Sequence, residues 1–139
     1  MTTSGQLHGS CLCGALRYRV SAPLADVAYC HCRMCQRSAG APALVWGSVP
    51  AASFAYEQGA PTIYRSSEHA EREFCARCGT QIAFRRLDGL GYVDFTLASL
   101  DDPEALAPTY HIWRMSRLAW FETTDALPRY DDGGPDLYS

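Results

Sequence analysis

Seven cysteines occur in three tight clusters, so metal and thiol chemistry is the first property that the sequence suggests. The clusters are Cys11 with Cys13, Cys30 with Cys32 and Cys35, and Cys75 with Cys78. A closed tetrahedral zinc site takes four thiolates, whereas a zinc with three protein ligands keeps one position open for water or substrate. One site of each kind would use every cysteine. The arrangement therefore predicts two zinc ions per chain, one structural and one able to bind a ligand.

Disulfide bonds are the alternative, because short cysteine-rich chains are often secreted. The odd number of cysteines disfavours them. Residues 1–10, MTTSGQLHGS, lack the basic start and apolar run of a signal peptide. Cysteines one or two residues apart also rarely meet disulfide geometry without strain. We therefore expect reduced, metal-bound cysteines and a cytoplasmic protein.

The two outer clusters share a pattern in which a glycine follows the second cysteine. They read Cys11-Leu12-Cys13-Gly14 and Cys75-Ala76-Arg77-Cys78-Gly79. Glycine permits the positive φ of a tight turn, and such a turn can direct backbone N–H groups at thiolate sulfur. We expect both turns to form one structural zinc site from Cys11, Cys13, Cys75 and Cys78. Because this metal closes a long loop, its binding energy becomes folding energy, about 10 to 16 kcal/mol in zinc-finger peptides at neutral pH.

The middle cluster differs because no fourth cysteine lies near Cys30, Cys32 and Cys35. His31 is an alternative fourth ligand, but strand alternation would point it away from its neighbours, which favours a packed or hydrogen-bonded role. An open zinc would ionise a bound thiol beside a carbonyl compound, or would ionise water instead. Arg33 and Arg37 are the first candidates to offset the thiolate charge, but we favour a solvated helix face for both, because most arginines are exposed.

The elements that must position these cysteines are mostly short strands. Period-two patterns and β-rich runs predict strands at 15–20, 43–46, 62–64, 82–84, 92–97 and 110–113. Only 34–39 and 103–106 have helical character, the latter with Asp101 or Asp102 as its cap. The pattern predicts a mainly β meander with little helix.

Length and composition indicate one domain over residues 1–139, with a core at about 9–122 and a loosely ordered tail at 131–139. The net charge of −3 provides no basic field for nucleic acid. No apolar stretch approaches the roughly 18 residues of a membrane span. We therefore expect neither nucleic acid nor a membrane as a partner.

Other residues with chemical potential carry weaker signals. The aromatic side chains of Trp46, Trp113, Trp120 and Phe121 could line a pocket, but we expect aromatic residues of β segments in the core. The histidines are scattered along the chain, at His8, His69 and His111. An acid-base role requires a partner, and the sequence alone does not place Glu73, Asp94 or Asp101 beside any of them.

Ordered motifs over about residues 9–122 resemble the glutathione-dependent formaldehyde-activating enzyme family, which includes centromere protein V. They are CxCG at Cys11–Gly14, HCxxCxRxxG starting at His31, YxSS at Tyr64–Ser67, RxFCxxCGT at Arg72–Thr80, LASLDDP at Leu97–Pro103 and HIW at His111–Trp113. The resemblance implies a mainly β, Mss4-like fold of short antiparallel strands with zinc knuckles. It also implies a structural zinc on the four outer cysteines and a second, substrate-facing zinc on Cys30, Cys32 and Cys35.

The same resemblance implies carbon-sulfur lyase chemistry, in which glutathione and formaldehyde are joined as S-hydroxymethylglutathione. In that case the partners are a small thiol such as glutathione and a small carbonyl compound, and the catalytic residues are the ligands of the open zinc. The alternative is a two-zinc binding or scaffold protein without catalytic activity. Zinc stoichiometry with and without added thiol discriminates the two, because a scaffold has no reason to exchange ligands at one metal only.

Overall fold

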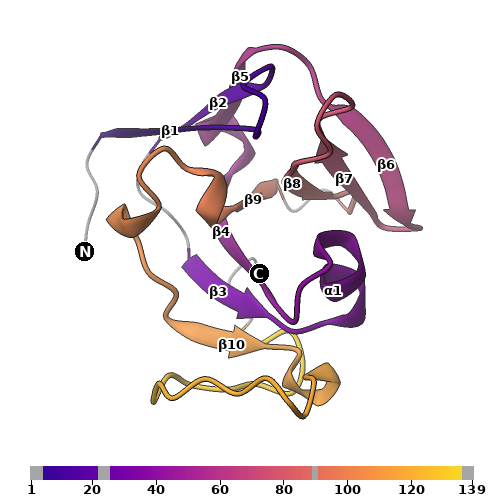
Figure 1. Cartoon of the computed structure of the whole chain (residues 1–139), viewed down its shortest axis with the longest axis vertical. Helices are drawn as coiled ribbons and strands as arrows, with labels where there is room; N and C mark the ends of the chain where they lie inside the picture. The colour runs from indigo at the N-terminus through magenta and orange to yellow at the C-terminus, as the bar shows by residue number, and fades with distance from the viewer. Residues whose placement is uncertain (1–4, 22–25, 89–90, 136–139) are drawn as a thin grey trace.

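The computed structural model describes residues 5–21, 26–88 and 91–135, and its strands form two sheets (Figure 1). The small sheet has the order β1-β2-β5, and the large sheet has the order β10-β3-β4-β9-β8-β7-β6. The strands are β1 (Gln6–Ser10), β2 (Arg17–Ser21), β3 (Asp26–Cys30), β4 (Leu44–Pro50), β5 (Phe54–Gln58), β6 (Thr62–Ser67), β7 (Ala70–Phe74), β8 (Gln81–Arg86), β9 (Tyr92–Thr96) and β10 (Tyr110–Ile112). The prediction of a mainly β fold is therefore confirmed.

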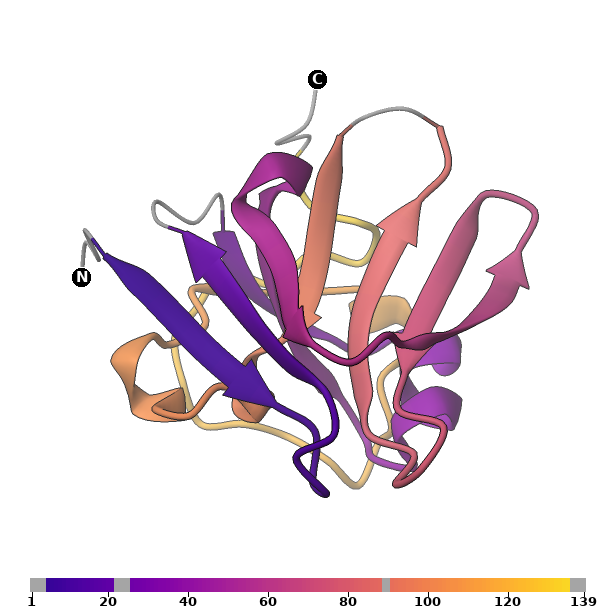
Figure 2. The same ribbon diagram turned by 90° about the horizontal axis from the view of Figure 1, so that it is seen from above.

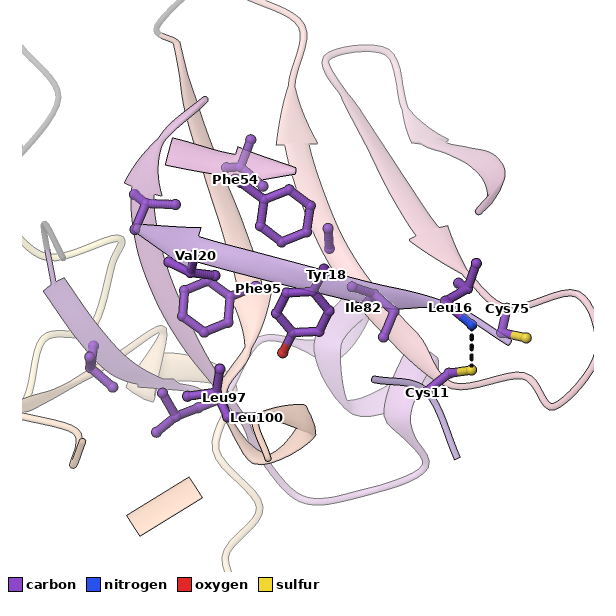
Figure 3. Packing of buried hydrophobic residues seen from close by; sticks show 14 residues of the cluster. Cys11, Leu16, Tyr18, Val20, Phe54, Cys75, Ile82, Phe95, Leu97 and Leu100 are labelled. Atoms are coloured by element: carbon purple, nitrogen blue, oxygen red, sulfur yellow. Dashed lines mark hydrogen bonds between the residues drawn. The ribbon is translucent and has the colours of Figure 1, made fainter. Parts of the chain in front are cut away.

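The main hydrophobic core lies between the two sheets. Tyr18 of β2 is fully buried and its ring lies 6.1 Å from that of Phe95 on β9. Figure 3 shows Tyr18 and Val20 packed with Phe95, while Phe54 of β5 stacks on Tyr18. Period-two alternation places every second residue of these strands on this side, as it does for Val93 and Phe95. The opposite face of the large sheet carries a smaller apolar cluster that contains Cys30, Cys35 and Trp46.

One true α-helix and several single turns connect the strands. Helix α1 (Arg33–Ala39) starts after β3, with the sulfur of Cys32 accepting a hydrogen bond from the backbone N–H of Cys35, and it ends at Gly40 in the left-handed conformation. In the part of the chain that the structure describes, the other helical segments are four 3₁₀ turns, η1 (Ala51–Ser53), η2 (Leu97–Ser99), η3 (Pro103–Ala105) and η4 (Arg114–Ser116). Within the described residues, no helix is long and apolar enough to cross a membrane.

The sequence missed four strands, namely β1, β3, β5 and β7. Charged and polar residues interrupt their alternation, and their strand conformation comes from pairing with neighbouring strands. The expectation of only two helical segments was also wrong, because η1, η2 and η4 were missed. The expected segment at 103–106 is a single 3₁₀ turn, and its preceding residue Asp102 makes no side-chain cap.

The strand order differs from the predicted meander, because β2 pairs with β5, β4 with β9 and β3 with β10, although these strands are not consecutive in the chain. Strands β3 and β10 pair in parallel, with Tyr29 opposite His111 and Cys30 opposite Ile112. The chain then turns back, and a segment at 128–130 lies along the outer side of β10, where it exchanges backbone hydrogen bonds with His111. Figure 1 shows this orange and yellow segment beside β10. Of the expected tail, residues 131–135 are described, and residues 136–139 lie outside the described residues.

Candidate metal centres

The four outer cysteines converge on one point although they come from two distant loops. Cys11 and Cys13 lie between β1 and β2, and Cys75 and Cys78 lie between β7 and β8. Their sulfur atoms all lie within 4.8 Å of one another, with Cys13 Sγ 3.6 Å from Cys11 Sγ and 3.8 Å from Cys75 Sγ. In Figure 2, the hairpin of β1 and β2 lies at one side of the molecule and that of β6 and β7 at the other. The cluster therefore brings together two loops from distant parts of the fold.

Both loops have the same turn geometry. The N–H of Cys11 donates to the carbonyl of Leu16, and the N–H of Cys75 donates to the carbonyl of Thr80, at 3.1 and 3.0 Å. Gly14 and Gly79 adopt positive φ angles of 81° and 82°. A residue with a Cβ atom is disfavoured in this conformation, which explains a glycine after each second cysteine.

Donors around two of these sulfurs, those of Cys11 and Cys78, favour the thiolate form. The N–H of Leu16 points at Cys11 Sγ from 3.2 Å, as the dashed line in Figure 3 shows. The hydroxyl of Thr80 lies 3.3 Å from Cys78 Sγ. Hydrogen bonds from the side chain and backbone of Thr80 lower the pKa of Cys78 to about 5. Thiolates are the species that bind zinc, so the loops are suited to hold a metal.

The middle cysteines form a second cluster at the junction of β3 and α1. Cys30 is the last residue of β3, Cys32 precedes α1, and Cys35 lies in its first turn. Their sulfurs lie within 4.8 Å of one another, and Cys35 Sγ lies 3.3 Å from Cys30 Sγ. No fourth His, Cys, Asp or Glu ligand among the described residues joins this group. The described part of the chain thus offers three ligands here.

A buried arginine that sequence reasoning did not single out lies beside this cluster. Arg72 of β7 is only 7% exposed, and its Nη2 lies 3.8 Å from Cys35 Sγ. Its guanidinium also donates to Gln81 and lies 5.1 Å from the ring centre of Phe84. Hydrogen bonds from Cys30 and Cys35, together with the charge of Arg72, lower the pKa of Cys32. The only available signal was the position of Arg72 in the RxFC motif.

The two arginines considered as partners of the thiolate charge lie on the surface of α1. Arg33 and Arg37 are both exposed. Arg33 donates to Gln36 at 2.6 Å, along the same face of α1. The favoured interpretation of a solvated helix face therefore agrees with the position of Arg37. Arg33 also lines the cavity described next, but the cation that contacts the sulfurs is Arg72.

A cavity of about 400 Å³ opens directly onto the three middle cysteines. All three cysteines belong to its wall. The remaining lining is mainly apolar and aromatic, with Asp94 and the two arginines as its charged members: Arg33, Met34, Trp46, Ser67, Ala70, Arg72, Phe84, Asp94, Ile112 and Trp113. A ligand held at this cluster would therefore lie in an aromatic environment.

His31 takes no part in the cluster and is fully buried on the other side of β3. Its Nε2 lies 2.9 Å from Nδ1 of His111, whose Nε2 lies 3.1 Å from Asp125. Burial lowers the pKa of His31 to about 4, so the ring is neutral at pH 7. The preference for a packed and hydrogen-bonded His31 thus agrees with its position. The partnership of His111 with Asp125 was missed, since these residues meet only after the chain turns back beside β10.

The other candidate residues divide between core and surface. Trp46 is buried, as expected of an aromatic residue in a strand, yet it also lines the cavity. Trp113 and Trp120 are 38% and 74% exposed, so the expectation that both lie in the core was wrong. The ring of Phe121 lies 6.2 Å from that of His31. Other residues without an assigned role make ion pairs: His8 with Glu57, Glu73 with Arg85, and Asp101 with Arg17.

The donor sets suit zinc in both clusters. Tetrahedral zinc with Zn–S bonds of about 2.3 Å places its sulfurs about 3.8 Å apart. The distances within the four-cysteine cluster are 3.6 and 3.8 Å, close to this value. Soft thiolate ligands without oxygen donors select zinc over magnesium or calcium. Cys11, Cys13, Cys75 and Cys78 would hold one ion, and Cys30, Cys32 and Cys35 would hold the other with one position facing the cavity.

Comparisons with known proteins agree with this architecture. The family model described as "Glutathione-dependent formaldehyde-activating enzyme" matches residues 6–116. A Schizosaccharomyces pombe protein named as an uncharacterized lyase is 30% identical over 92 residues, which cover 60% of this chain and 61% of that protein. A crystal structure of a Rhodobacter sphaeroides protein superposes with a TM-score of 0.57 at 24% identity, over 68% of this chain and 87% of the other. The latter similarity shows a shared fold.

Proposed function

Because the chain belongs to the glutathione-dependent formaldehyde-activating enzyme family, we propose that it is a zinc-dependent, carbon-sulfur lyase-like enzyme of small thiol adducts. The family reaction, in which glutathione and formaldehyde give S-hydroxymethylglutathione, is the model for this activity. The lyase name of the Schizosaccharomyces pombe relative supports the same reaction class. Cys30, Cys32 and Cys35 would be the catalytic centre as ligands of the open zinc.

The observation that carries this proposal is the contrast between the two cysteine clusters. Four sulfurs lie within 4.8 Å of one another, the number of ligands that a closed zinc site takes, whereas three sulfurs line the wall of a cavity. Structural zinc sites are closed, and catalytic sites keep a position open. The three-cysteine cluster has the second pattern, and the cavity supplies space for a substrate.

The proposed chemistry adds a thiol to a carbonyl compound. Bound zinc supplies a Lewis acid that ionises the thiol near neutral pH. Sulfur forms a bond to the carbonyl carbon, and the carbonyl oxygen takes up one proton in place of the one that the thiol lost. Arg72 offsets the negative charge that the three thiolates and the substrate sulfur bring together, since its guanidinium lies within 3.8 Å of Cys35 Sγ. Trp46, Phe84 and Trp113 limit the access of water to the reacting atoms.

Ligand exchange at one metal tests the proposal. Titration of the zinc-loaded protein with a small thiol should release protons and occupy a single position, and Cys32→Ser should abolish this binding. Calorimetry in buffers of different ionisation heat measures the released protons. Formaldehyde with glutathione, followed by NMR exchange after subtraction of the uncatalysed rate, then measures turnover. A protein that binds two zinc ions, exchanges no thiol at millimolar concentration and leaves the exchange rate at background would be a scaffold instead.

A further inference from the structure

The cavity beside the three middle cysteines contains features that the family reaction does not use. Formaldehyde is the smallest carbonyl compound, and glutathione carries carboxylates at both of its ends. The cavity wall instead presents the rings of Trp46, Phe84 and Trp113 and the side chain of Ile112. Its volume of about 400 Å³ exceeds what a one-carbon substrate fills. Pockets lined in this way bind an apolar group and use a few polar atoms for orientation.

The charged side chains of the cavity wall do not favour a carboxylate ligand. The guanidinium of Arg72 donates to Gln81 and Ser38 at 2.8 and 3.3 Å, and it faces the cysteine sulfurs. Arg33 donates to Gln36. Asp94 adds a carboxylate of its own, which accepts a hydrogen bond from Ser48. Both arginines keep their charge, because these partners are neutral, but Arg72 faces the thiolates and Asp94 repels a carboxylate, so Arg33 is the one charged side chain of the cavity wall that is left to attract one.

Trp113 is held at this cavity in an unfavourable backbone conformation. It is the one non-glycine residue with positive φ in the described part of the chain, at 58°. Its N–H donates to Asp132 at 2.8 Å, and the next N–H donates to Tyr130 at 3.0 Å. Left-handed backbone is unfavourable for a residue with a Cβ atom. Such strain is characteristic of positions where a side chain must be held at a functional site.

We propose that the substrates of this site are thiol adducts with an apolar, aromatic-sized substituent, which lies between Phe84, Ile112 and Trp113 while its sulfur occupies the open position beside Cys30, Cys32 and Cys35. The inference rests on the proposed function and narrows its substrate class. The preferred thiol is accordingly an uncharged one of about the size of benzyl mercaptan, and glutathione is the weaker ligand.

The test compares benzyl mercaptan, glutathione and 2-mercaptoethanol on the zinc-loaded full chain, with binding followed by calorimetry and tryptophan fluorescence. Benzyl mercaptan should bind about tenfold or more tightly than either of the others, a factor that corresponds to about 1.4 kcal/mol. Phe84→Ala and Trp113→Ala should each weaken the binding of benzyl mercaptan several-fold more than the binding of 2-mercaptoethanol. Trp120→Ala is the matched control, because Trp120 is exposed and is not part of the cavity wall.

The outcomes separate the inference from the proposed function. The inference would be overturned if glutathione bound as tightly as benzyl mercaptan and if neither Phe84→Ala nor Trp113→Ala changed the affinity for benzyl mercaptan. Thiol chemistry at the site would then still stand. Equal binding of benzyl mercaptan and benzyl alcohol, insensitive to Cys32→Ser, would support the apolar cavity and remove the thiol function. Absence of binding by every one of these compounds would overturn both. Circular dichroism of the variants establishes that a loss of binding is not a loss of fold.

Discussion

At the scale of single residues, the position of Arg72 is the main addition to what the cysteines indicate. A thiolate cluster in a partly buried site needs positive charge or N–H donors to be stable. The four-cysteine cluster obtains N–H and hydroxyl donors from its own loops. The three-cysteine cluster obtains a guanidinium from β7, a strand distant in sequence. Both clusters thus have N–H donors from their own loops, as Cys35 donates to Cys32 Sγ, and the three-cysteine cluster has a guanidinium in addition.

Arg72→Met is expected to weaken zinc binding at the three-cysteine cluster by about 10- to 100-fold, the usual effect of losing a partner of a metal ligand. The remaining thiolates would lose their nearest cation, while zinc at the other cluster should be unaffected. Competition with a chromophoric chelator measures both affinities. Arg37→Met serves as the control, because Arg37 lies on the same helix as Cys35 and is exposed. Equal effects of the two substitutions would contradict the role given to Arg72.

At the scale of elements, the two glycine turns and the returning segment beside β10 hold the sites in place. Each turn uses positive φ at a glycine to bring two cysteines to the metal side of its loop. The returning segment joins β10 through backbone bonds at Pro128 and Tyr130 and through Asp125. Since β10 carries Ile112 and is followed by Trp113, this segment also supports the cavity wall.

Gly79→Ala should destabilise the zinc-loaded protein by about 1 kcal/mol, although no atom would obstruct the added methyl group. The cost arises from the φ of 82°, which alanine adopts poorly. Denaturant unfolding of the loaded protein measures the change. Gly5→Ala is the matched control, because Gly5 also has open space around it and has no positive φ. If both variants unfold at the same denaturant concentration, the turn does not depend on glycine.

Asp125→Asn should destabilise the fold most at neutral pH, and the destabilisation should begin to shrink as the pH falls below the unfolded pKa. A hydrogen bond from Thr123, with others from the Leu127 backbone and His111, holds the pKa of Asp125 below its ordinary value. The stabilisation is therefore fully present above the unfolded pKa of about 3.9, and it is lost as the pH falls through the lower folded pKa. Urea unfolding from pH 7 to pH 3 measures the difference from the unsubstituted protein. A difference that grows on acidification would refute this assignment, and Asp102→Asn controls for loss of a surface acid.

At the scale of the whole molecule, the two clusters stand in different relations to the fold. The four-cysteine cluster connects the β1–β2 loop of the small sheet with the β7–β8 loop of the large sheet. Cys11 and Cys75 are also members of the main core. The three-cysteine cluster comes from one short stretch of chain and closes no long loop. Metal binding at the first cluster should therefore contribute more to stability than metal binding at the second.

Cys75→Ser should remove one zinc and strongly destabilise the chain, because structural zinc binding is linked to folding. Cys32→Ser should also lose about one equivalent of zinc but keep most of the stability, because an open site contributes more to ligand binding than to folding. Metal analysis and thermal unfolding of both variants provide the comparison. Similar melting temperatures for the two variants would mean that the clusters are not divided into structural and catalytic sites.

The sequence by itself determined the family, the mainly β class, helix α1 and the division of the cysteines into a group of four and a group of three. These features depend on local spacing, on alternation along strands and on ordered motifs, which are all present in the linear chain. Gly14 and Gly79 illustrate this, because a glycine after a cysteine pair already indicates a turn with positive φ.

Only the tertiary structure decided what surrounds the clusters. Arg72 reaches Cys35 because β7 and α1 meet in space, and His111 meets both His31 and Asp125 because β10 pairs with β3 and with the returning chain. The strands β1, β3, β5 and β7 were missed because backbone pairing with other strands establishes them, whereas their own residues show no clear alternation. Contacts between distant segments leave no local pattern, so the charge beside the thiolates and the aromatic wall of the cavity could be known only from the folded chain.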